Sequence, residues 1–223
     1  MITLESLNRI EAMRYLGCGS TPPDDNTKAL LDECELKVLS ACQPKYLYKY
    51  FDIDTITSSV TLKGCSLVLG GRDIVAHLEG CYGVVIMCAT LSGGIDNLIR
   101  TLQITDMARA VVANALASVA VEQVCDRVEK LIDMQYNNCY KTFRFSPGYG
   151  DLPIDIQKDF LTVLDAPKKI GLCTGATRML TPIKSVTAII GLSNNTIGKK
   201  KRGCVSCNLK GSCQFRKAGN RCV

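Results

Sequence analysis

The stretch DMARAVVANALASVAVEQVCDRVEKLIDMQY, residues 106–136, is the longest periodic segment of the chain. It is rich in alanine in its first half and charged in its second half, which predicts one long or slightly bent helix. Small side chains let a helix approach its neighbours closely, so we expect the Ala-rich half to pack closely against a sheet.

The segments on either side of this helix mix helical and strand patterns. Apolar residues at helical spacing predict helices over residues 3–15, 25–41, 74–78 and 156–164. Apolar runs predict strands over residues 45–53, 60–69, 83–89, 170–174 and 185–192, the first two pairing as a hairpin. Because regular βαβ repetition is absent from this order, we expect an α+β fold with a mostly antiparallel sheet and one long Ala-rich helix.

The composition is that of a globular protein. The chain has 223 residues and a hydrophobic content of 47%, which is enough for a sizeable core. It contains no uncharged apolar run of the roughly 18 residues that a bilayer requires, and its first residues lack the apolar region of a signal peptide. We therefore expect a cytoplasmic protein with no membrane partner.

Several common catalytic sites are excluded by residue counts and spacing. With a single histidine, His77, neither a catalytic triad nor a histidine-based metal site is expected. The glycine pairs at residues 70–71 and 93–94 follow neither the dinucleotide-binding nor the P-loop pattern. Nucleotide hydrolysis is therefore not expected.

Cysteines are frequent, and four of the thirteen lie close together in the last twenty residues. The other nine are scattered, mostly in apolar surroundings, as buried thiols of a reducing compartment are. The spacing Cys-x2-Cys-x5-Cys-x8-Cys offers four thiolates to one metal, and its first pair is typical of zinc and iron–sulfur sites. The predicted ligands are Cys204, Cys207, Cys213 and Cys222. Either metal fits, and thiols without a metal remain an alternative.

The net charge of +6 is concentrated in the same segment. Residues 199–223 carry eight Lys or Arg and no acidic residue, whereas residues 1–198 carry 19 basic and 21 acidic residues. We therefore predict a main domain of residues 1–198 and a basic, Cys-rich metal-binding tail of residues 199–223. A nucleic-acid partner is not expected, because the main domain is not basic.

The segment RFSPGY, residues 144–149, combines an arginine, a Pro-Gly turn and an aromatic ring. Such a turn aims a bidentate donor and a ring into one space, and Gly148 lets the backbone approach a ligand. The same residues also suit an arginine that satisfies a helix C-terminus beside a core tyrosine. Residue types alone leave both interpretations open.

The pattern Arg-x-x-x-Gly-Tyr resembles the motif with which the activation domain of cobalamin-dependent methionine synthase holds S-adenosylmethionine. Gly171-Leu172, Pro182 and Ser185-Val186 are similar to a second segment of that family. The resemblance covers about residues 1–192 and implies the fold of that domain. The residues to which it assigns ligand binding are Arg144, Gly148 and Tyr149.

The chain departs from the family pattern at two acidic positions. Gly175-Ala176-Thr177 stands where the family has Thr-Glu-Ser, and Ser118 stands near another family acid in the long helix. S-adenosylmethionine carries an ammonium and a sulfonium, so each lost charged contact is expected to weaken its binding by about 1–3 kcal/mol. Asp151 and Asp155 are candidates to replace these acids, or else ordinary acids at a helix N-terminus.

The resemblance implies an accessory role toward a partner that carries cobalamin. That partner is a corrinoid methyltransferase or the cobalamin domain of methionine synthase, reactivated by reductive methylation of cob(II)alamin with S-adenosylmethionine. The alternative is a non-catalytic binding or electron-delivery module of the same fold, with zinc or an iron–sulfur cluster at the terminal cysteines. A third interpretation is that the tail is a zinc knuckle that binds nucleic acid. The acidic main domain argues against this interpretation.

Overall fold

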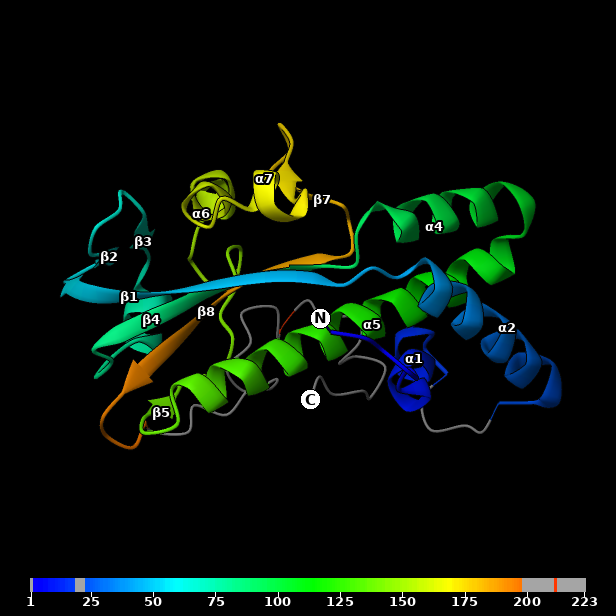
Figure 1. The fold of residues 1–223 in the computed structure, drawn as a ribbon, viewed down its shortest axis with the longest axis horizontal. Helices are drawn as coiled ribbons and strands as arrows, with labels where there is room; N and C mark the ends of the chain where they lie inside the picture. Colours follow the sequence, from blue (N-terminus) through cyan, green and yellow to red (C-terminus); the bar gives the residue numbers. More distant parts are fainter. Residues whose placement is uncertain (1, 19–22, 198–210, 212–223) are drawn as a thin grey trace.

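The computed structural model describes residues 2–18, 23–197 and 211. A six-stranded antiparallel sheet in the order β3-β2-β1-β4-β8-β5 forms its centre, with helices on both faces (Figure 1). The strands of this sheet are β1 (Lys45–Ile56), β2 (Ser59–Leu62), β3 (Val68–Gly70), β4 (Gly83–Thr90), β5 (Tyr140–Lys141) and β8 (Ser185–Ser193). A separate two-stranded sheet pairs β6 (Cys173–Thr174) with β7 (Leu180–Thr181).

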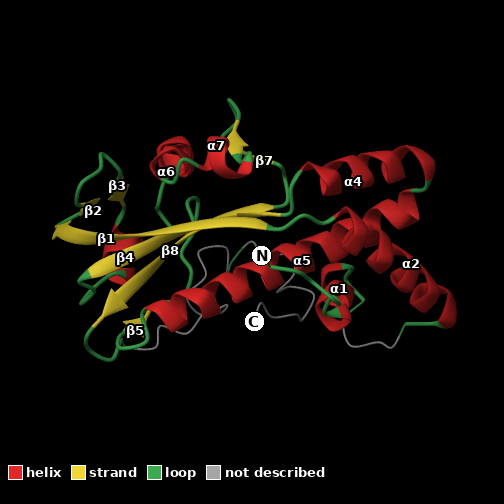
Figure 2. Ribbon diagram, viewed as in Figure 1, coloured by secondary structure: helices red, strands yellow, loops and turns green. Residues whose placement is uncertain are grey.

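Helices cover the two faces of the main sheet unequally (Figure 2). One face packs against α5 (Met107–Gln135). Three further helices belong to the same hydrophobic cluster and pack on α5, namely α1 (Arg9–Tyr15), α2 (Asp25–Ala41) and α4 (Gly93–Thr105). The opposite face packs against α3 (Arg72–His77), α6 (Gln157–Val163) with the preceding 3-10 turn Ile154–Ile156, and α7 (Ala166–Ile170). The α+β class with an antiparallel sheet and one long helix is thus confirmed.

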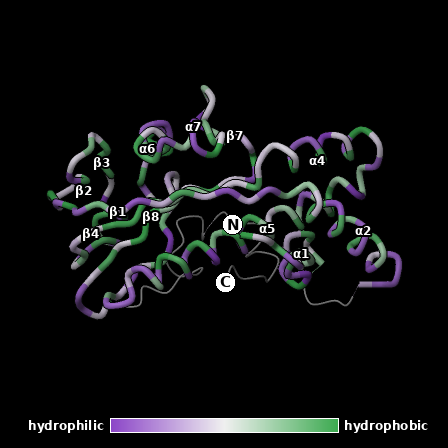
Figure 3. The backbone as a smooth tube through the Cα atoms, in the orientation of Figure 1, coloured by the Kyte–Doolittle hydropathy of each residue, from purple (hydrophilic) through white to green (hydrophobic). Residues whose placement is uncertain are grey.

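The central strand β4 divides the core into two clusters. All eight of its residues are buried, and the central strands stand out as hydrophobic in Figure 3. Because side chains alternate along a strand, Val85 and Met87 join the cluster that includes α5, whereas Val84 and Ile86 join the cluster on the α6 side. Each face of one strand therefore supplies the centre of a separate hydrophobic layer.

The long helix α5 begins and ends where the sequence predicts. Asp106 caps it by accepting a hydrogen bond from the Arg109 N–H at 3.1 Å. Its Ala-rich half packs mainly between α2 and α4, and its second half passes beneath the sheet (Figure 1). This half also lies at the sheet, as predicted, because Lys184 next to β8 donates to the Asn114 carbonyl at 3.2 Å and to Ser118 at 2.8 Å; its contacts with α2 and α4 are additional. By length and composition α5 could cross a membrane, but 61% of its most apolar stretch is buried inside the fold, as in a core helix.

Other predicted elements match closely where the apolar pattern is unambiguous. Helix α2 has the predicted bounds and is capped by Asp24, which accepts from the Thr27 N–H at 2.7 Å. Strands β1 and β2 form the predicted hairpin, and β4 and β8 lie side by side with Ile86 opposite Ile189.

The helix predicted over residues 3–15 begins only at Arg9. Residues 2–8 instead contact α2 and α5 through their backbone, since the Leu7 N–H donates to Glu35 at 2.7 Å and the Asn8 N–H donates to Gln123 at 2.9 Å. Side chains of α2 and α5 thus accept hydrogen bonds from backbone N–H groups that would otherwise need acceptors within a helix. Of the apolar residues whose spacing suggested this helix, Leu4, Leu7 and Met13 are buried, whereas Ile10 is 81% exposed.

Three further predictions need correction. The strand predicted over residues 60–69 is two strands, β2 and β3, with a turn between them at Gly64, whose φ of 81° favours glycine. Within the strand predicted over residues 170–174, only Cys173–Thr174 form a strand, β6, because Ile170 is the last residue of α7 and residues 171–172 belong to neither element. Helix α4 was not predicted, although Ile95, Leu98 and Leu102 have helical spacing, because the glycines before it were interpreted as a turn.

The start of α4 tests the packing of this layer. A Cβ on Gly94 would lie 2.6 Å from the Ala41 carbonyl oxygen, whereas a Cβ on Gly93 would meet nothing within 4 Å. Gly94→Ala is therefore expected to destabilise the protein by about 1–3 kcal/mol through overpacking. Gly93→Ala should be neutral or slightly stabilising, since alanine favours helices. Urea unfolding measures both, and equal midpoints for the two variants would contradict the α2–α4 packing.

Candidate functional site

The Arg144 segment lies beside β8 and alternates its side chains between the two faces of the sheet. Phe145 bridges to Ile189, its N–H donating to the Ile189 carbonyl at 2.9 Å. Phe143 and Phe145 both contact the ring of His77, with centroids 4.5 and 4.9 Å apart. Arg144 lies between these two phenylalanines and turns toward α5 instead.

Three carboxylates of α5 hold the Arg144 guanidinium. Its Nη2 lies 2.9 Å from Asp126 and 3.1 Å from Glu122, and its Nε lies 3.0 Å from Glu129. The arginine side chain is only 10% exposed. Burial acts to lower the pKa of Arg144, but the attraction of the Cys125 thiol and of these carboxylates outweighs it, so the net pKa is raised. Arg144 is thus a fixed cation that joins the segment after β5 to α5.

Sequence reasoning missed these carboxylates as site residues. Glu122, Asp126, Glu129 and Asp133 are spaced by four, three and four residues, which puts them on one face of a helix. This spacing was visible in the sequence. The partner that gives three of them a shared role, Arg144, is at least 15 residues further along the chain.

The Pro-Gly turn that follows Arg144 packs against the opposite layer. Gly148 has a φ of 87°, and its N–H donates to the Leu152 carbonyl at 2.9 Å. The Tyr149 side chain is 66% exposed, and its ring makes an edge contact with Phe145 at 5.8 Å. Arg144 and Tyr149 therefore share one segment but contact different neighbours, the arginine α5 and the tyrosine the Phe145 ring.

Asp151, a candidate replacement for the missing family acids, stabilises α3. Its carboxylate accepts from the Arg72 N–H at 2.7 Å and from the Asp73 N–H at 3.0 Å. The bonds from Asp73 and Arg72 lower the pKa of Asp151. The close approach depends on Gly71, because its φ is 132° and a Cβ there would lie 2.5 Å from the carboxylate. Asp151 is thus an acid at a helix N-terminus, but the helix is α3 and not the one that follows Asp151 in the chain.

The other acidic and polar positions singled out in the sequence also have protein partners. Asp155 forms an exposed ion pair with Arg178 at 3.0 Å. Ser118 accepts from the Lys184 ammonium at 2.8 Å. His77 is 4% exposed, and its Nε2 lies 2.9 Å from the Phe143 carbonyl oxygen, so it is a core histidine.

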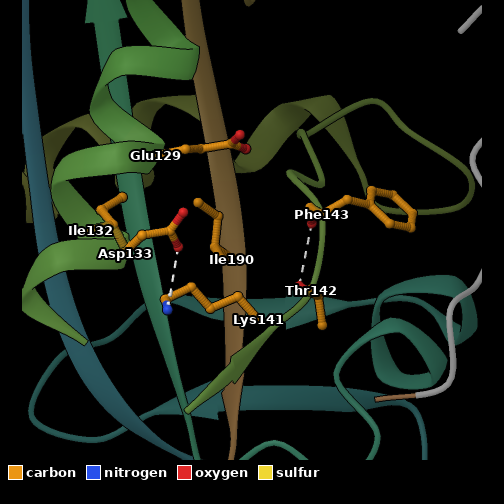
Figure 4. Close-up of a pocket in the computed structure, with 7 residues that line it drawn as sticks. All are labelled: Glu129, Ile132, Asp133, Lys141, Thr142, Phe143 and Ile190. Carbon is orange, nitrogen blue, oxygen red and sulfur yellow. Dashed lines mark hydrogen bonds and ion pairs between the residues drawn. The ribbon is translucent and has the colours of Figure 1, made fainter. Parts of the chain in front are cut away.

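A cavity of about 310 Å³ lies beside the Arg144 ion pairs, between the second half of α5, β5 and β8 (Figure 4). Glu129 connects the two features, since it pairs with Arg144 and also lines the cavity. Lys141 is 16% exposed and lies 3.2 Å from Asp133 across the cavity edge. The lining residues are Glu129, Ile132, Asp133, Lys141, Thr142, Phe143 and Ile190. The cavity therefore combines apolar walls with charges of both signs.

The predicted metal site cannot be placed. Cys204, Cys207, Cys213 and Cys222 lie outside the described residues. Within residues 2–18 and 23–197 the nine cysteines are free thiols, and no group of three or more His, Cys, Asp or Glu side chains is arranged to hold a metal. The tail boundary and its metal stay predictions.

Comparison with known proteins identifies the fold. No family model matches the chain, and no curated protein matches it in sequence. Among solved structures it is similar to a crystal structure described as the MetH reactivation domain bound to AdoHcy (S-adenosylhomocysteine). The TM-score is 0.60 at 13% sequence identity, and the match covers 85% of this chain and 67% of that chain.

The chain has the fold of a MetH reactivation domain. This is the methionine synthase domain that the residues 144–149 resemble, so the expected fold is confirmed. At 13% identity the likeness extends to the fold alone, and the ligand roles of Arg144, Gly148 and Tyr149 stay predictions.

The contact of Asp151 with α3 predicts a pH-dependent stability. Since the pKa of Asp151 is lowered on folding, its contribution is complete above the unfolded aspartate pKa of about 3.9 and is lost as the pH falls through the lower folded value. Asp151→Asn keeps one acceptor and loses the charge, so it should lower the Tm at neutral pH. The Tm difference from wild type should shrink below about pH 4.

Asp155→Asn is the matched control, because it removes the same charge from an exposed ion pair, and such pairs contribute little to stability. Thermal unfolding followed by circular dichroism between neutral and acidic pH measures both variants. Equal Tm losses for the two variants would contradict a structural role of Asp151.

Proposed function

We propose that this chain supports reactivation of a cobalamin-dependent methionine synthase or related corrinoid methyltransferase. It would hold S-adenosylmethionine for the reductive methylation of cob(II)alamin on that partner. The observation that carries the proposal is the shared fold with the MetH reactivation domain bound to AdoHcy, over 85% of this chain. The match of residues 144–149 to the family motif supports it independently.

The charges around Arg144 suit the proposed methyl donor. S-adenosylmethionine carries a carboxylate, an ammonium and a sulfonium, so its site needs groups of both signs. Arg144 supplies a cation, and Glu129 and Asp133 supply carboxylates beside the cavity. Hydrogen bonds to charged groups contribute about 1.5–3 kcal/mol each, enough for these acids to offset the one missing at residues 175–177.

The chemical role of the chain in this proposal is positioning. S-adenosylmethionine supplies the methyl group, a separate one-electron donor supplies the reducing equivalent, and the partner supplies the cobalt nucleophile. Arg144 would orient the ligand from a fixed place, because three carboxylates already hold it. Fixed orientation of the donor accelerates transfer by removing the entropy cost of bringing the reactants together.

The reaction itself is the test of this function. A cob(II)alamin form of a corrinoid methyltransferase is incubated with S-adenosylmethionine and a one-electron reductant, and methylcobalamin formation is followed by its absorbance. We expect the protein to accelerate reactivation and the Arg144→Lys variant to lose about ten- to a hundredfold of that effect, because lysine lacks the planar fork.

Arg178→Lys is the control for this experiment, since Arg178 forms only an exposed pair with Asp155. It should act like the wild type. No acceleration by the wild-type protein would contradict the proposed function.

The second candidate is a binding or electron-delivery module of the same fold. Its support is the set of four cysteines and eight basic residues in residues 199–223. An iron–sulfur cluster there would give anaerobically purified protein an absorption band near ~400 nm. Stoichiometric zinc without iron, measured by elemental analysis, would rule out electron delivery, and a deletion after residue 198 should abolish either metal.

A further inference from the structure

The cavity beside Arg144 has a net negative charge. Its apolar walls include Ile132 and Ile190, which are 0% and 2% exposed, and its charged lining residues are Glu129, Asp133 and Lys141. Glu129 and Asp133 keep 31% and 60% of their side chains exposed, so their oxygens are accessible to a ligand. Two carboxylates and one ammonium line the cavity. When Arg144 and its other partners Glu122 and Asp126 are counted too, four carboxylates face two cations, so the surroundings are net negative.

The single ammonium of the cavity is already bound within the protein. Lys141 Nζ donates to the Tyr136 carbonyl at 2.8 Å and lies 3.2 Å from Asp133. Tyr136 follows the last residue of α5, so Lys141 satisfies a carbonyl at this helix C-terminus, where cations are favoured. Asp133 and Glu129 are paired as well, with Lys141 and Arg144, but they are more exposed than Lys141, so the carboxylate side is the part of the cavity that a charged ligand reaches more easily.

We propose that this cavity selects the cationic methyl donor over its demethylated product. The inference rests on the proposed function and names which form of the ligand the site prefers. S-adenosylmethionine and AdoHcy have the same skeleton, but the first has a sulfonium and the second a neutral thioether. A net negative cavity attracts the sulfonium and gains nothing from the thioether, so loss of the methyl group weakens binding and favours exchange of product for donor.

The size of the cavity is compatible with a small ligand, and its charges indicate which end of the ligand would lie there. Its volume of about 310 Å³ is at the lower limit of small-molecule sites, which span about 300–1,000 Å³. Its carboxylates, Glu129 and Asp133, would lie at the sulfur-bearing end of the ligand. At a half-exposed site one net charge near the sulfonium should change affinity by about five- to tenfold.

Calorimetric titration of the full chain with three ligands tests the selectivity. The ligands are S-adenosylmethionine, AdoHcy and sinefungin, an analogue with an amine at the sulfonium position. We expect the two cationic ligands to bind about five- to tenfold tighter than AdoHcy at low salt, and this preference to decrease at high salt. Asp133→Asn should reduce the preference to about twofold or less while AdoHcy affinity stays nearly unchanged, which also reports that the variant is folded. Glu129→Gln should reduce the preference as well, and because Glu129 also pairs with Arg144, it should lower the affinity for all three ligands.

Glu122→Gln and Asp126→Asn are matched controls. These acids pair with Arg144 as Glu129 does, but they do not line the cavity. They should lower the affinity for all three ligands alike and keep the preference. Equal affinities of the wild type for donor and product, or a preference retained in both cavity variants, would overturn the selectivity and leave the proposed function standing. Failure of all three ligands to bind the wild type would overturn the proposed function as well.

Discussion

The ion pairs of Arg144 hold the two main parts of the site together. These parts are the segment after β5, which carries Arg144, and helix α5, which carries its three carboxylate partners. The ion pairs connect the segment after β5 to the middle of the helix that precedes it. Since the arginine is 10% exposed but its partners are 31–59% exposed, removing it should cost about 1–3 kcal/mol, less than breaking a fully buried pair. The cavity lies beside these ion pairs, between α5, β5 and β8.

The same ion pairs connect ligand binding with the position of α5. A ligand that contacts Arg144 must share it with Glu129, which also lines the cavity. The acids nearest the Pro-Gly turn do not take part, because Asp151 is bonded to α3 and Asp155 to Arg178. The carboxylates available to a cationic ligand are therefore those of α5. The fold of a MetH reactivation domain is thus combined with a set of acids that the family motif does not contain.

Much of the fold was predictable, because its central elements have unambiguous patterns. The fully buried β4, the capped α2 and the long α5 each follow from local residue types. The N-terminal segment and α4 were not predicted correctly, since their structure depends on α2 and α5 contacts that no local pattern contains. The Arg144 motif was found by resemblance. Its partner Glu129 was not, because an acid on a charged helix face normally only contacts solvent.

The central claim is that the region between α5, β5 and β8 binds an S-adenosyl ligand. Amide chemical-shift mapping of the labelled protein during titration with AdoHcy tests it most directly, because the method reports each backbone position separately. The account predicts the largest shifts at Glu129, Asp133, Thr142 and Ile190, which line the cavity, with smaller ones in α3. Shifts confined to α3 and α6, or no shifts at saturating ligand, would contradict it.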